Sequence, residues 1–152
     1  MLKNWPPEYN TKYVPDNDDP FWDRKLETMD PREREETVIF PKLQAQLHYA
    51  HRNSPFYRNK WDSAGVTPED IQSLADFEKI PFVTKDEIRE DQLKHPPFGS
   101  NLCISKDEIA SVHGTSGTTG KPTAFGISQG DMQRIGEAHA RIMWGFGMRP
   151  DD

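Results

Sequence analysis

The chain has 152 residues, the length of one ordinary domain, and its 19 Lys and Arg against 25 Asp and Glu give a formal net charge of −6. This acidic balance argues against a nucleic-acid-binding protein, which needs a basic face, and against electrostatic docking on an anionic membrane. Hydrophobic residues make up only 34% of the sequence, whereas aromatic residues reach 11%. We therefore expect a folded chain with a thin core that packs against something else.

The sequence carries no signal for export or membrane insertion. Its single cysteine, Cys103, excludes an intramolecular disulfide, and no Cys/His spacing resembles a zinc site. The first residues lack the apolar stretch of a secretory signal, and no segment approaches the roughly 18–20 apolar residues of a transmembrane helix. We expect a cytoplasmic protein that binds neither membrane nor nucleic acid, in which Cys103 is a small buried hydrophobe.

Residues 1–20 combine prolines with aromatic residues, a composition typical of an extended segment. We predict an extended N-terminal arm over residues 1–20 that docks on the surface of the chain through its aromatic side chains. The simplest interpretation is a structural strap, and a strap that binds a partner is the alternative.

The segment from residue 21 to about residue 100 predicts short helices separated by turns that proline marks. Asp30 and Pro31 begin the first, because Asp30 can accept from the first-turn amides and Pro31 suits the first helical position. Pro41 is expected to interrupt this helix, since proline lacks the N–H that a helix interior uses. Similar signals predict further helical segments at Leu43-Leu47-Ala50, Ser54-Pro55, Thr67-Pro68 and Thr84-Lys85.

From about residue 101 the periodicity changes. Residues 109–113 and 123–127 predict two strands, joined by a Gly/Ser/Thr-rich loop at 114–122. Ser128 and Asp131 predict the capped start of a last helix. Its apolar face consists of Ile135, Ala138, Ile142 and Phe146. The predicted fold class is therefore α/β: short helices, then a strand–loop–strand hairpin, then a helix.

The loop has the composition of a phosphate-binding site. Its three glycines permit positive φ and a close approach to a bulky anion, and successive N–H groups can form a concave nest for phosphate oxygens. Hydroxyl donors and one positive charge come from Thr115, Ser116, Thr118, Thr119 and Lys121. The loop is not a Walker loop, because five residues separate Gly114 from Gly120 and Pro122 follows Lys121. A flexible hairpin turn of small residues is the structural alternative.

Other polar residues have simpler explanations. His113 precedes the loop and could contact substrate or phosphate, but a histidine at a strand end is the default interpretation. His48 and His51 form only a weak metal pair, and a polar helix face explains them. The acidic residues at 16–19 read as a solvated turn. We predict no metal ligands and no catalytic residue.

The loop sequence Thr115-Ser116-Gly117-Thr118-Thr119-Gly120-Lys121-Pro122 resembles the phosphate-loop signature of the adenylate-forming, or AMP-binding, superfamily, which includes the acyl-CoA synthetases. The blocks at 54–58, 80–85, 97–99 and 112–113 are similar to the phenylacetate–CoA ligase-like branch. The resemblance begins at about residue 21. It implies that residues 21–152 are a partial N-terminal AMP-binding domain, a fragment of the large domain of such an enzyme.

The resemblance implies a two-step ligation with ATP, Mg²⁺ and coenzyme A as cosubstrates. A carboxylic acid, aromatic in this branch, attacks the α-phosphate of ATP to give an acyl-adenylate and pyrophosphate, and the CoA thiol then displaces AMP. Contacts with the ATP phosphates are implied for Thr115, Ser116, Gly117, Thr118, Thr119 and Gly120, and charge neutralisation is implied for Lys121.

Members of the superfamily run to several hundred residues, and the segments that bind adenine, ribose and magnesium, the hinge and the C-terminal lysine have no counterpart here. We therefore expect the chain to be incomplete, inactive alone, and dependent on the missing remainder or a complementing subunit, with self-association as a further outcome. The alternative is a non-catalytic subunit or truncated relic that binds nucleotide or a partner chain.

Overall fold

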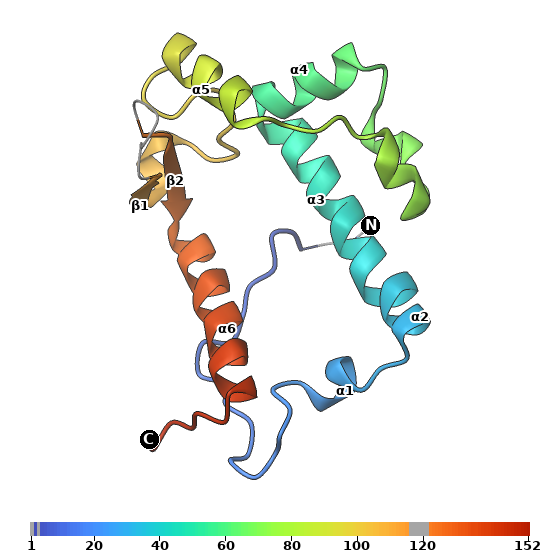
Figure 1. Ribbon diagram of the computed structural model, residues 1–152, viewed down its shortest axis with the longest axis vertical. Coiled ribbons are helices and arrows are strands. Elements are labelled where there is room, and N and C mark those ends of the chain that lie inside the picture. Colours follow the sequence, from blue (N-terminus) through green and yellow to red (C-terminus); the bar gives the residue numbers. More distant parts are fainter. Residues whose placement is uncertain (1, 3, 116–121) are drawn as a thin grey trace.

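The structure is a computed structural model that describes residues 2, 4–115 and 122–152. Two long helices, α3 (Phe40–Asn53) and α6 (Gln129–Gly145), form two sides of an open frame (Figure 1). Helices α4 (Pro55–Ser63) and α5 (Lys85–Lys94) close the frame at the end that carries the strands, and α1 (Arg24–Glu27) lies toward the other end (Figure 1). Among the described residues, no helix is long and apolar enough to cross a membrane.

The predicted helix starts are confirmed by their caps. The Asp30 carboxylate accepts from the first-turn amides of α2 (Pro31–Arg34), and the Ser54 hydroxyl accepts from the Tyr57 N–H at 3.4 Å. Thr84 and Ser128 form capping boxes at the starts of α5 and α6. Single 3₁₀ turns complete the connections: η2 (Pro68–Asp70), η3 (Ala75–Lys79) and η4 (Lys106–Glu108).

The interruption expected at Pro41 is wrong. The chain remains helical from α2 through η1 (Glu35–Ile39), a π-helical turn, into α3. The N–H of Phe40 donates to the carbonyl of Glu35, five residues back, so the wider turn absorbs the proline that a regular α-helix would exclude. Pro41 then occupies the first turn of α3, where a missing N–H is tolerated.

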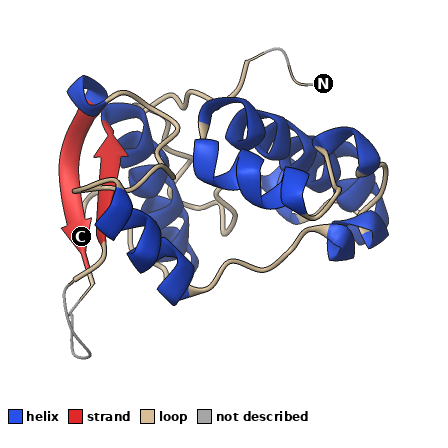
Figure 2. Cartoon of the chain, turned by 90° about the horizontal axis from the view of Figure 1, so that it is seen from above, coloured by secondary structure: helices blue, strands red, loops and turns tan. Residues whose placement is uncertain are grey.

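The two predicted strands are present and form one antiparallel hairpin. Strand β1 (Ile109–Gly114) pairs with β2 (Ala124–Ser128), with Gly114 opposite Ala124 and an irregularity between Ile109 and Ser111. The hairpin lies beside the start of α6, to which β2 leads directly (Figure 2). The predicted order of short helices, strand–loop–strand and helix is therefore confirmed.

The core lies between α3, α4 and the segment that follows α4. Its buried members are Leu47, Ala50, Trp61 and Ile71. The apolar face of α3 is thus covered, whereas that of α6 is not. Ile142 and Phe146 are 52% and 80% exposed, and Trp144 is the buried residue of this helix.

The N-terminal segment, residues 4–22, precedes α1 and bridges the two long helices. Trp5 donates its indole N–H to the Gln46 side chain on α3 at 3.0 Å, and the buried Trp22 donates to Glu137 on α6 at 2.8 Å. These contacts agree with a structural strap. The division of the chain at residues 20 and 21 into an arm and a partial domain stays a prediction.

Candidate nucleotide-binding site

The ends of the predicted phosphate-binding loop are joined by two hydrogen bonds. The Thr115 N–H donates to the Thr123 carbonyl at 3.1 Å, and the Thr123 N–H donates to Thr115 Oγ1, also at 3.1 Å. The Thr115 hydroxyl therefore accepts one bond and donates none to another described residue. The other predicted loop residues, Ser116, Gly117, Thr118, Thr119, Gly120 and Lys121, lie outside the described residues, and their roles stay predictions.

The two hydrogen bonds between Thr115 and Thr123 close the neck of the loop. Thr123 is a residue that the sequence reasoning did not single out. Its side chain is only 1% exposed, and its Oγ1 has no hydrogen-bond partner among the described residues. A buried hydroxyl of this kind is costly unless something satisfies it. The only signal for Thr123 in the sequence was its position directly after the loop, because the composition of this segment does not set one threonine apart from the others.

Gln92 on α5 holds the next residue, Ala124, through its side-chain amide. Gln92 Nε2 donates to the Ala124 carbonyl at 2.6 Å, and the Ala124 N–H donates to Gln92 Oε1 at 3.2 Å. Sequence reasoning missed this contact, because no local pattern links a helix residue to a strand 32 positions later.

Asp91, the neighbour of Gln92, organises the segment that follows α5. Its carboxylate accepts from the N–H and the hydroxyl of Ser100, at 2.6 and 2.7 Å. The Ser100 carbonyl in turn accepts from the Phe56 N–H and the Ser54 hydroxyl, both at 3.2 Å. Gly99 has φ +78°, and a Cβ there would lie 2.4 Å from the Asp91 carboxylate, so the close approach requires glycine. Together these contacts connect α5 to the start of α4.

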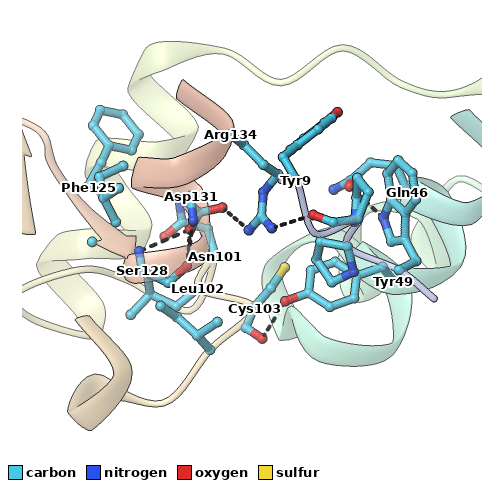
Figure 3. A pocket seen from close by; sticks show the side chains of 16 residues that line it. Tyr9, Gln46, Tyr49, Asn101, Leu102, Cys103, Phe125, Ser128, Asp131 and Arg134 are labelled. Carbon is cyan, nitrogen blue, oxygen red and sulfur yellow. Dashed lines mark hydrogen bonds and ion pairs between the residues drawn. The ribbon is translucent and has the colours of Figure 1, made fainter. Parts of the chain in front are cut away.

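A cavity of about 410 Å³ lies between the N-terminal segment, α3, β2 and the start of α6 (Figure 3). Arg134 reaches across it, with Nη2 2.6 Å from Asp131 Oδ1 and Nη1 3.2 Å from the Pro7 carbonyl. Burial raises the pKa of Asp131, but hydrogen bonds from Arg134 and Ser128 outweigh it, so the pKa lies below its usual value. Because Asp131 and Arg134 neutralise each other, this cavity is not built to attract a charged ligand.

The histidines do not form a shared site. His48 lies 3.5 Å from Glu69, whereas His51 lies 2.8 Å from Asp62 and stacks on Trp61. His113 is exposed on β1, opposite Phe125.

The remaining candidates also have structural explanations. Asp19 pairs with Arg24 at 3.0 Å. The Phe21 N–H is the main cause that lowers the Asp19 pKa, with a further contribution from Arg24. Cys103 is partly buried against the core, and this burial raises the pKa of its thiol. Over residues 2, 4–115 and 122–152, no three His, Cys, Asp or Glu side chains cluster in a way that could hold a metal.

Comparison with solved structures places the fold among CoA ligases. A crystal structure of 2-hydroxyisobutyryl-CoA ligase, in complex with 2-HIB-AMP and CoA in the thioesterification state, superposes with a TM-score of 0.92 and 50% sequence identity. The match covers 98% of this chain and 31% of the ligase. An open conformation of the same ligase gives a TM-score of 0.90 at 48% identity, over 97% of this chain and 34% of the other. The fold is therefore that of a fragment of a CoA ligase.

Sequence comparison specifies the branch. Phenylacetate–CoA ligase of Thermus thermophilus is 38% identical over 126 residues, which are 83% of this chain and 27% of the relative. The Escherichia coli enzyme of the same name is 35% identical over 129 residues, 82% of this chain and 28% of the relative. No protein-family model matches the chain. The resemblance to the phenylacetate–CoA ligase-like branch is confirmed, and the chain spans 27–34% of the length of these relatives.

Proposed function

We propose that the chain is the N-terminal portion of an ATP-dependent acyl-CoA ligase and that it supplies the loop that binds the ATP phosphates. The observation that carries this proposal is the closed neck between Thr115 and Thr123, at the tip of a hairpin with the loop sequence of adenylate-forming enzymes. Support comes from the 50% identity to a ligase whose structure holds an acyl-adenylate and CoA.

In the proposed reaction the loop works by positioning and electrostatic stabilisation. Its hydroxyl and amide donors, including the Thr115 hydroxyl, would bind the β- and γ-phosphates, and Lys121 would neutralise charge as the substrate carboxylate attacks the α-phosphate. In the reaction that the resemblance implies, Mg²⁺ would accompany ATP as a cosubstrate. Coenzyme A would then take the acyl group, with AMP as the leaving group.

The substrate is proposed to be a small carboxylic acid. The sequence resemblance favours an aromatic acid, in line with relatives named for phenylacetate. The higher identity to a ligase named for 2-hydroxyisobutyrate favours a short hydroxy acid instead. A panel of aryl, alkyl and hydroxy acids separates the two possibilities.

The remainder of the enzyme is proposed to cover α6. Ile142, Phe146 and Met143 are 52%, 80% and 43% exposed on this helix, a pattern that marks a protein contact rather than a solvated face. This exposed face also supports the alternative, a non-catalytic nucleotide-binding subunit whose partner chain covers the same helix.

Pyrophosphate exchange with the full-length protein tests the proposal. Labelled pyrophosphate should appear in ATP only when an acid from a panel of aryl, alkyl and hydroxy acids is present, and CoA should then give a thioester detectable by mass. Nucleotide binding without exchange would favour the non-catalytic alternative. Absence of nucleotide binding would contradict both.

A further inference from the structure

We infer that Gln92 is a positioning residue for the phosphate-binding loop, an inference that rests on the function proposed above. Its side-chain amide fixes Ala124, the first residue of β2, and through Ala124 it sets where the chain leaves the loop.

The contact satisfies both backbone groups of Ala124 at once. The carbonyl accepts from Gln92 Nε2 at 2.6 Å, and the N–H donates to Gln92 Oε1 at 3.2 Å. In an antiparallel strand the N–H and C=O of one residue point to the same side. Those of Ala124 therefore point away from β1, and the Gln92 amide occupies the place that a neighbouring strand would take.

The exit of the loop is consequently held from two sides. Thr123 bonds Thr115, on the β1 side, through both its carbonyl and its N–H. Ala124 bonds Gln92, on the opposite side. Two consecutive residues anchored in opposite directions fix both the position and the direction of the backbone, which is what a loop that must meet a polyphosphate requires.

Gln92 is itself held in place. Its Nε2 also lies 3.4 Å from the Phe98 carbonyl, and the neighbouring Asp91 binds Ser100 through two hydrogen bonds. A Cβ at Gly99 would lie 3.1 Å from Gln92 Cγ, so the backbone of this segment packs against the side chain. The amide is thus pre-oriented toward Ala124 by the segment that follows α5.

The Gln92 amide is neutral and binds backbone groups outside the predicted loop. Its loss should therefore affect the use of ATP selectively. Loss of the anchor would misplace the loop donors and weaken the use of ATP. The acid and CoA would be affected less, because neither is proposed to contact the loop.

The test uses the full-length ligase with Gln92→Met, which removes the hydrogen bonds at similar side-chain volume. Gln133→Met, at an exposed position on α6, is the matched control. Pyrophosphate exchange gives the KM for ATP and for the acid, and thermal melting gives the stability. For Gln92→Met we expect the KM for ATP to rise about 3- to 10-fold, with the KM for the acid within about twofold of wild type. The control should match wild type in both.

Two results would overturn the inference: an unchanged KM for ATP in Gln92→Met, or equal rises in the KM for ATP and for the acid. If Gln92→Met melts below the assay temperature, Gln92→Glu replaces it, because its carboxylate keeps the acceptor for the Ala124 N–H and loses the donor to the Ala124 and Phe98 carbonyls. The same selective rise is expected there, and its absence counts against the inference. A wild-type enzyme without acid-dependent exchange would instead refute the proposed function, and with it the role of Gln92.

Discussion

The indole rings of Trp22 and Trp144 meet edge to face, with their centroids 5.7 Å apart and an interplanar angle of 79°. Each ring also donates its N–H across the same junction: Trp22 to Glu137 on α6, and Trp144 to the Asp19 carbonyl in the N-terminal segment. The guanidinium of Arg149 lies 3.9 Å above the Trp144 ring. This junction attaches the N-terminal segment to the end of α6, the helix that follows the β1–β2 hairpin.

Trp22→Ala should therefore destabilise the chain strongly. Truncation of a large buried aromatic side chain costs about 3–5 kcal/mol, and Trp22 is only 7% exposed. Denaturant unfolding of the 152-residue chain measures the loss. Phe82→Ala is the matched control, since Phe82 is 94% exposed and its truncation should change the free energy of unfolding by less than about 0.5 kcal/mol. Equal effects of the two substitutions would contradict the strap.

The exposed face of α6 predicts how the 152-residue chain behaves by itself. We expect it to bind a dye specific for apolar surface and to self-associate, as measured by fluorescence and analytical ultracentrifugation. The double substitution of Ile142 and Phe146 by Ser should reduce both signals, because these side chains are 52% and 80% exposed. A monomer that melts cooperatively at high temperature without binding dye would show that the chain is a finished domain.

The stability of the chain should fall in acid. The ammonium of Lys60 and the N–H of Thr84 lower the pKa of Glu87 from 4.5 to about 2. Lys79, Ser73 and Gln72 lower that of Asp76 from 3.8 to about 2. A depressed pKa in the folded state contributes stability that is complete above the unfolded value and is lost as the pH falls through the folded one. The free energy of unfolding should thus decrease between about pH 4.5 and pH 2.

Glu87→Gln and Asp76→Asn should each flatten this acid dependence, measured as the denaturant midpoint against pH. Glu90→Gln, at an exposed position on the same helix as Glu87, serves as the control and should keep the wild-type slope. A wild-type midpoint that does not move between about pH 4.5 and pH 2 would show that these hydrogen-bonded carboxylates do not stabilise the fold.

The parts of the fold that the sequence predicted are those with local signals. Asp30, Ser54, Thr84 and Ser128 cap helices because a side-chain oxygen reaches amides two or three residues along the chain. Alternation and glycine content likewise located both strands and the loop between them. Proline at position 41 misled the prediction, because a π-helical turn that no local pattern announced accommodates it.

Contacts between distant parts of the chain could not be predicted, because no local pattern encodes them. The bond from Gln92 to Ala124 and the pairing of Trp22 with Trp144 join residues far apart in the chain. The unequal burial of α3 and α6 has the same origin, since both helices carry an apolar stripe and only tertiary packing decides which one is covered. The loop residues could be named as phosphate ligands from their types and a resemblance, and their roles stay predictions.

Lys121→Ala and Ser116→Ala in the full-length protein test those roles directly. A charged contact to a phosphate is worth about 1.5–3 kcal/mol, so Lys121→Ala should lower kcat/KM for ATP by about 10- to 150-fold at that magnitude. Ser116→Ala removes a neutral donor and should cost less, on the order of 0.5–1.5 kcal/mol. Steady-state pyrophosphate exchange at varied ATP measures both, and the KM for the acid should stay near wild type.

Lys106→Ala is the control, because Lys106 is an exposed lysine of η4. It removes one positive charge from an acidic chain and should leave pyrophosphate exchange unchanged. Wild-type kinetics in both loop variants would remove the loop from the mechanism, whereas a loss shared by Lys106→Ala would point to the overall charge rather than to a phosphate contact.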